Sequence, residues 1–141
     1  MNLNKLIFLI LLLYSAISFA QKNDNPNLAL LLKQWEFVDF ETVDSSSEKM
    51  IVTLTKYAEK VSFNFNEDFY LQVVFSETKK EIYKWNFKRK FTIEIISLDI
   101  KNFNKDIVGE FVIRDLRNIS SIFLERKGQP HNGIMLKLFE N

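Results

Sequence analysis

The 141-residue chain has no cysteine, three glycines, two prolines and one histidine. The absence of cysteine excludes a disulfide framework and a thiol nucleophile, so the stability of the fold must come from packing. A single histidine leaves no second imidazole for a metal pair, and no Gly-x-Ser-x-Gly turn occurs in the chain. We therefore expect a protein that is not an enzyme, with no catalytic residue, no metal site and no cofactor.

A surplus of charge of one sign is also missing. Lys5 is the only charged residue among the first twenty, so 18 Lys and Arg face 18 Asp and Glu in the rest of the chain. A balanced chain has no strong field with which to gather nucleic acid or an anionic membrane from a distance. We expect no nucleic-acid partner.

Residues 1–20 have the regions of a secretory signal peptide. Lys5 gives a positive start, Leu6 to Leu13 is an unbroken apolar run, and Ser18-Phe19-Ala20 places small residues where a signal peptidase cleaves. The apolar run is shorter than the roughly 20 residues that cross a bilayer as a helix, and no cysteine is present to accept a lipid. We expect cleavage before Gln21 and a periplasmic or secreted protein that is not a lipoprotein and has no membrane span.

The mature chain begins with a polar segment. Residues 21–27 are rich in asparagine and contain a proline, and we expect a flexible leader there. Asn25 or Asn27 is placed to cap a short helix over residues 28–34. Residues 28–141 are expected to form one domain.

Eight segments alternate apolar and polar residues, which is typical of half-buried strands. They are residues 35–43, 61–66, 69–76, 83–88, 91–95, 111–116, 122–127 and 134–139. The connections are too short for parallel crossovers, so successive strands should be antiparallel neighbours. Closure removes the exposed edges of such a sheet, and we expect a mainly β fold, an eight-stranded antiparallel up-and-down barrel. An immunoglobulin-like sandwich is the alternative, but it needs longer connections.

The segment after the first strand has two interpretations. Ser45 and Glu48 have the spacing of a capping box, and apolar residues then recur at helical intervals, which predicts a helix over residues 47–60. The β-branched residues of 51–55 favour a strand instead. We expect the helix.

The apolar face of the strands should line the inside of the barrel. The expected lining residues are Phe63, Phe65, Leu71, Val73, Tyr83, Trp85, Phe87, Ile93, Phe111, Ile113, Leu124 and Leu136. In an outer-membrane barrel this face would contact lipid, but the charged face would then crowd a narrow lumen. An eight-stranded barrel is wide enough either to be filled by side chains or to hold one small ligand.

Residues 79–90 are locally basic and contain interleaved aromatic rings. Strand alternation sends Tyr83 and Trp85 to one face and Lys84 and Lys88 to the other, so these residues do not form a platform for nucleic-acid bases. We expect a solvated strand surface. His131 lies in a polar connection and is expected to be an exposed turn residue.

A short helix that leads into Trp35, followed by alternating segments joined at Asn66-Glu67-Asp68, resembles the small lipocalin-like domains exported by Bacteroidetes-type bacteria. The resemblance covers most of residues 28–141. It implies that Trp35 plugs one end of the barrel and that Arg126, from a late strand, stacks across its ring. It also implies noncovalent binding of a small hydrophobic or amphipathic ligand in the lumen. The alternative is a filled barrel that serves as an interaction module of the envelope, with a protein partner that the sequence does not identify.

Overall fold

The computed structural model describes residues 25, 27–44, 51–57, 59–115 and 120–140. The expected signal peptide and nearly all of the expected leader lie outside these ranges. Within them the chain forms one helix, α2 (Asn27–Leu31), and nine strands. The strands are β1 (Gln34–Asp44), β2 (Ile51–Thr55), β3 (Ser62–Phe65), β4 (Tyr70–Val74), β5 (Lys80–Arg89), β6 (Thr92–Ser97), β7 (Gly109–Asp115), β8 (Ser121–Arg126) and β9 (Gly133–Leu138).

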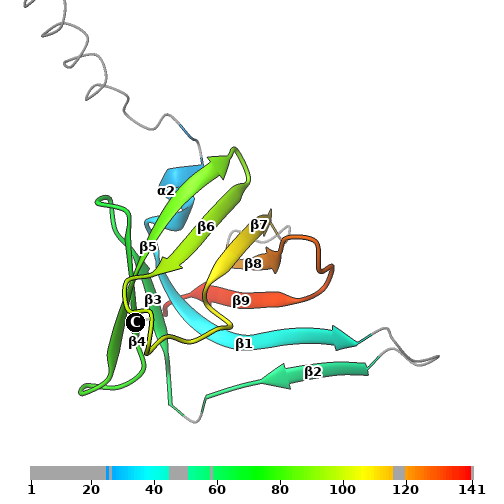
Figure 1. Cartoon of the computed structure of the whole chain (residues 1–141), viewed down its shortest axis with the longest axis horizontal. Helices are drawn as coiled ribbons and strands as arrows, with labels where there is room; N and C mark the ends of the chain where they lie inside the picture. The colour runs from blue at the N-terminus through cyan, green and yellow to red at the C-terminus, as the bar shows by residue number, and fades with distance from the viewer. Residues whose placement is uncertain (1–24, 26, 45–50, 58, 116–119, 141) are drawn as a thin grey trace, which may run out of the picture.

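Eight of these strands close into an antiparallel barrel (Figure 1). The order runs from β1 through β3 to β9 in sequence, and β9 returns to pair with β1. The closing ladder joins Trp35 to Leu138 at one end and Glu41 to Gly133 at the other. The expected mainly β fold and the closed eight-stranded antiparallel barrel are therefore confirmed, and the barrel strands fall on the eight alternating segments.

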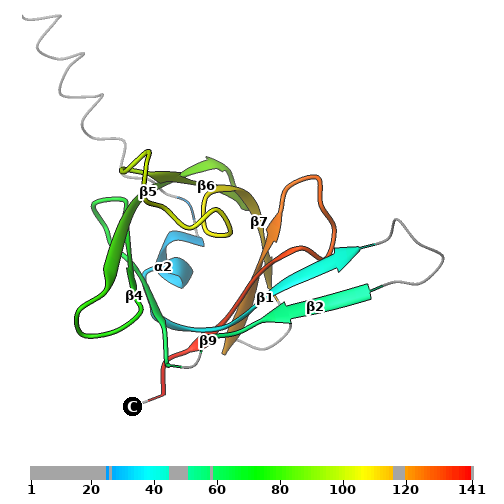
Figure 2. The same ribbon diagram turned by 60° about the horizontal axis from the view of Figure 1, so that its bottom comes forward.

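The expected helix over residues 47–60 is wrong, because residues 51–55 form strand β2. This strand pairs with the second half of β1, from Phe40 opposite Thr55 to Asp44 opposite Ile51. The far half of β1 runs beyond the barrel and offers an unpaired ladder, which the β-branched sequence of β2 fits better than a helix would. The β1–β2 hairpin projects from the barrel in Figures 1 and 2. The expected capping residues, Ser45 and Glu48, lie outside the described residues.

Helix α2 sits at the end of the barrel where β1 begins, which we call the helix end. It is shorter than the expected helix over 28–34, because the chain turns and enters β1 at Gln34. The Asn25 side-chain oxygen accepts a hydrogen bond from the backbone N–H of Asn27 at 3.0 Å, as a capping residue does. The Asn27 side chain donates to the carbonyl of Lys90, which ties the helix to the β5–β6 turn. No helix among the described residues has the length and apolarity to span a membrane.

The opposite end, which we call the loop end, is covered by the connection between β6 and β7, residues 98–108. Ile107 of this connection is fully buried and belongs to the core. Figure 2 looks along the barrel and shows both α2 and this yellow connection within the outline of the ring of strands. The barrel is therefore covered at both ends.

Candidate functional site

The lumen was the expected site, and eleven of the twelve expected lining side chains are buried in one core cluster. The exception is Phe87, which is partly buried and packs against that cluster. A β-bulge between Phe87 and Arg89 interrupts the alternation of β5 there.

The lumen is filled by the side chains that line it. Phe63, Leu71, Ile93, Phe111 and Leu136 have no accessible surface at all. A side chain beside a void that admits water keeps accessible surface facing that void, even when the void is closed to the outside. These five residues come from five different strands, so within the part of the chain that the structure describes no void of that size adjoins any of them.

Trp85, on β5, is buried against the rings of neighbouring strands and turns. Its ring lies 5.3 Å from that of Phe65 and 5.2 Å from that of Phe69, in an edge-on and a tilted arrangement. Its indole N–H donates to the carbonyl of Tyr70 at 3.2 Å, so burial leaves no indole donor without a partner.

Trp35 is fully buried at the helix end. Its indole N–H donates to the carbonyl of Leu31, the last residue of α2, at 3.2 Å. The tryptophan and the helix therefore close this end as one unit.

Arg126 is not brought to Trp35. The β8–β9 and β9–β1 registers put the end of β8 at the level of Glu41, whereas Trp35 stands at the other end of β1. The Arg126 guanidinium instead lies 4.9 Å from the centre of the Phe111 ring. The expected cation–π contact thus has a different aromatic partner.

The Arg126 guanidinium also holds the β6–β7 connection. It donates to the carbonyls of Val108 at 2.9 Å and of Asp106 at 3.0 Å. Gly109 allows this approach, because a Cβ atom there would stand 2.6 Å from a guanidinium nitrogen and the backbone has a φ of +141°. The arginine is therefore a clamp on the cover of the loop end.

Two tyrosines connect the same cover to the wall. The Asn104 side chain donates to the Tyr57 hydroxyl at 2.7 Å, and its backbone N–H donates to the Tyr83 hydroxyl at 3.2 Å. The Tyr83 hydroxyl in turn donates to the Glu81 carboxylate. Burial, and then the hydrogen bond to Glu81, raise the pKa of Tyr83, and burial also raises the pKa of Tyr57.

Sequence reasoning named Tyr83 and Arg126, but it did not find Tyr57, Asn104 or Ile107. The spacing of Tyr57 was assigned to a helix over residues 47–60. In the structure Tyr57 follows β2, and its ring centre lies 5.1 Å from that of Phe37 and 5.2 Å from that of Phe75. Ile107 lies in a connection whose apolar residues are unevenly spaced, so no regular period marks it; they are Leu98, Ile100, Phe103, Ile107 and Val108. The adjacent apolar residues Ile107 and Val108, at the end of this connection, are a signal that could have suggested a cover.

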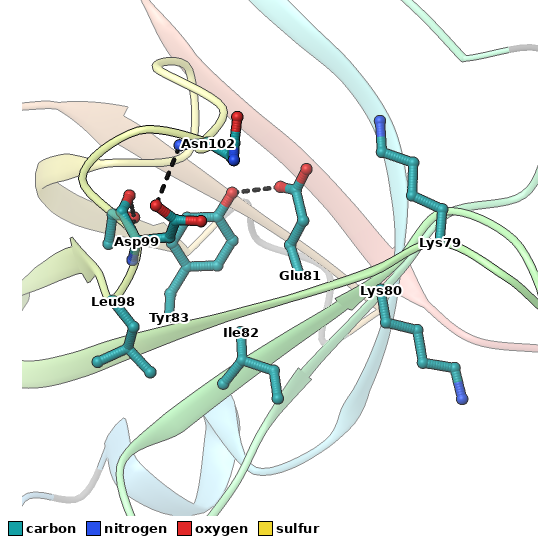
Figure 3. Close-up of a pocket in the computed structure, with 9 residues that line it drawn as sticks. Lys79, Lys80, Glu81, Ile82, Tyr83, Leu98, Asp99 and Asn102 are labelled. Carbon is teal, nitrogen blue, oxygen red and sulfur yellow. Dashed lines mark hydrogen bonds between the residues drawn. The ribbon is translucent and has the colours of Figure 1, made fainter.

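A cavity of about 430 Å³ lies at the loop end, outside the packed lumen. It is formed by the start of β5 and the start of the β6–β7 connection (Figure 3). In the figure Glu81 points to the Tyr83 hydroxyl, whereas Lys80, Ile82 and Leu98 point to the other side of the strand. This cavity has both apolar and charged walls.

The basic segment and the histidine lie on the surface. Lys88 forms an ion pair with Glu94 at 2.9 Å, and the other lysines between residues 79 and 90 are exposed. His131 is an exposed turn residue with a φ of 63°, and its backbone N–H donates to Glu125. Among the residues that the structure describes, no group of three or more His, Cys, Asp and Glu is placed to hold a metal ion.

Comparison with models of protein families, with curated proteins and with solved structures finds no match for this chain. The class that the fold defines is the closed eight-stranded antiparallel β-barrel with a packed interior.

Proposed function

We propose that the chain is an exported, lipocalin-like up-and-down barrel whose filled interior is structural and whose function is noncovalent binding at its outer surface. It acts as an interaction module of the envelope and performs no chemical step. The observation that carries the proposal is the absence of accessible surface on the side chains in the middle of the lumen.

The packed lumen argues against a ligand inside it. Pockets for small molecules have volumes of about 300 Å³ or more. To open such a space, the chain would have to move α2, which is tied to Trp35 and Lys90, or the β6–β7 connection, which is tied to Arg126. The buried rings would also lose their contacts with one another, at a cost of several kcal/mol for each large side chain displaced.

Export is part of the proposal. Residues 1–20 act as a cleavable signal peptide, residues 21–27 as a leader, and the domain begins at residue 28. The mature protein is free in the periplasm or outside the cell, without a lipid anchor. The mature chain carries no net side-chain charge, so its partner is selected by a local surface and not by a long-range field.

Native mass spectrometry of protein purified from its own host tests the proposal. We expect the mass of a polypeptide that begins at Gln21, with no small molecule retained. A lipid or metabolite that stays bound, and whose removal changes the fluorescence of the buried Trp85, would overturn the filled-barrel proposal and restore luminal binding. A retained signal peptide would overturn its export.

The loop-end cavity supports a second candidate, binding of a small amphipathic ligand. Its volume of about 430 Å³ exceeds the lower limit for small-molecule pockets. The residues that line it include the apolar Ile82 and Leu98 and the cationic Lys79 and Lys80, which suit the apolar part and the anionic group of such a ligand. A monomeric short-chain anionic phospholipid is a suitable probe, and Leu98→Ser should weaken its binding severalfold in a calorimetric titration.

A further inference from the structure

The outer wall of β5 and β6 carries apolar side chains that nothing in the described chain covers. Ile82 and Leu98 are each 51% exposed, and Ile96 is 44% exposed. Ile100, two residues beyond Leu98, is 89% exposed. We call these four residues the outer apolar patch.

The register of the sheet explains why three of them form a group. Tyr83 pairs with Ser97 and both belong to the inner parity, so Ile82 and Leu98 are the next residues on the outer face of the two strands. Lys84 pairs with Ile96 on the same face. Figure 3 shows Ile82, Leu98 and Lys80 on one side of β5.

Lysines border the outer apolar patch. Lys80 and Lys84 flank Ile82 on the outer face of β5, and Lys101 follows Ile100; all three are exposed. The Lys84 ammonium lies 5.9 Å from the centre of the exposed Tyr70 ring. The ammonium group of such a lysine lies in water, while its alkyl chain covers neighbouring apolar surface.

The nearby carboxylates do not neutralise these lysines. Glu81 points to the Tyr83 hydroxyl on the inner side. Glu94 is paired with Lys88. The Asp99 carboxylate accepts two backbone N–H groups of its own turn, which lower its pKa, so it stays ionised but is turned towards its own backbone. The face therefore has an excess of positive charge around an apolar centre.

We propose that the outer apolar patch docks the barrel onto an anionic lipid surface. Ile100, Leu98 and Ile82 enter the boundary between headgroups and acyl chains, and Lys80, Lys84 and Lys101 contact the lipid phosphates. This inference rests on the proposed function, since it names the partner of the outer surface.

Charge and size favour a membrane over other occupants. A second copy of the chain would bring lysines against lysines. A stable protein interface buries about 800 Å² and 20 to 30 residues on each side, which is far larger than four apolar side chains with a few lysines. A bilayer needs no complementary shape, and it supplies both the apolar layer and the negative charge.

Vesicle sedimentation tests the docking. The exported protein is mixed with vesicles of phosphatidylcholine alone or with about one-third phosphatidylglycerol added. We expect binding to the anionic vesicles, at least about fivefold stronger than to the neutral ones and weakened as the salt concentration rises from about 0.05 to 0.5 M. Equal binding to both, or no dependence on salt, would overturn the proposal.

Two variants test the residues. Leu98→Ser with Ile100→Ser removes the apolar contact, and Lys80→Glu with Lys84→Glu reverses the charge; each should reduce vesicle binding at least about tenfold. The matched control for the first is Leu54→Ser, because Leu54 is also 51% exposed but lies on β2, on the projecting hairpin. Lys56→Glu is the control for the second. Both controls should bind as the wild type does.

The outcomes separate this proposal from the proposed function. Unreduced binding in both patch variants, with thermal unfolding unchanged, overturns the docking. Equal affinity for a monomeric short-chain phospholipid and for vesicles also overturns it, in favour of the loop-end cavity. If the protein binds no vesicle and retains no small molecule in mass spectrometry, the docking proposal is overturned and the proposed function stands.

Discussion

Trp85 is the residue whose burial best measures how tightly the barrel is packed, because rings contact it from several sides and it is 1% exposed. Trp85→Ala removes these contacts and leaves a cavity that the surrounding strands close only in part. We expect a loss of about 3 to 5 kcal/mol in the free energy of unfolding, measured by urea denaturation.

The control is an exposed aromatic residue of the same barrel. Phe91 is 49% exposed, so Phe91→Ala should cost less than about 1 kcal/mol. A loss below about 1 kcal/mol for Trp85→Ala as well would show that the ring does not belong to the core.

Tyr83 links the stability of the barrel to alkaline pH. Burial and the hydrogen bond to Glu81 raise its pKa above the ordinary value of 10.0, so the folded state keeps the phenol proton that the unfolded chain releases. Its contribution to stability is therefore complete below pH 10.0 and falls as the pH rises above that value. Tyr83→Phe should lose less stability than the wild type between about pH 9 and 11 in urea denaturation. Parallel losses in the two proteins would contradict this linkage.

At the scale of elements, the β6–β7 connection depends on Arg126. Arg126→Gln removes three hydrogen bonds to carbonyls of the connection, those of Lys105, Asp106 and Val108, and the contact with the Phe111 ring. Amide exchange within residues 98–108 should become at least about tenfold faster, while exchange in the barrel strands stays close to that of the wild type.

Arg114→Gln is the matched control for the clamp. Arg114 pairs with Glu125 at 2.9 Å, and its side chain is 55% exposed. Exposed ion pairs contribute about 0 to 1 kcal/mol, so this variant should leave the exchange of residues 98–108 unchanged. Equal acceleration in both variants would mean that the connection is held by something other than Arg126.

The strands could be predicted from the sequence because each one is half buried, and burial of one face imposes a period of two on its residues. The stretch from Phe69 to Phe75 and the stretch from Phe111 to Asp115 are clear examples. Residues 51–55 were mistaken for part of a helix because the spacing of Leu54 and Tyr57 fits both structures. The choice is made by the far half of β1, which supplies the hydrogen-bond partners of β2 and which the spacing of apolar residues within 47–60 does not reveal.

The candidate site was less predictable than the strands. Parity places Phe63 and Phe111 inside, but it does not say whether side chains fill the space between them, since that depends on volumes from all the strands together. The partner of Arg126 depends on the register of β8 against its neighbours, which alternation leaves open. The outer apolar patch was not predicted for a similar reason. Ile82 and Ile96 lie at positions that alternate with the buried residues of their strands, and such positions are expected to be polar.

At the scale of the whole molecule, the first and last strands close the barrel. A chain that ends at Asn132 lacks β9, and β1 and β8 then have no partners along that side. We expect this truncated chain to remain unfolded, as measured by the loss of dispersed amide signals in an NMR spectrum. A truncated chain with a native-like spectrum would show that the remaining strands form a stable open sheet.

The same closure has a consequence for biosynthesis. The ladder between Trp35 and Leu138 forms only when β9 is available, so a chain whose β9 has not yet been synthesised cannot close its barrel. Under the export proposed above, the chain would cross the membrane before its barrel closes. The chain is most prone to aggregation just before β9 pairs, when β1 and β8 each expose an unpaired strand edge. A chaperone would protect it best at that stage.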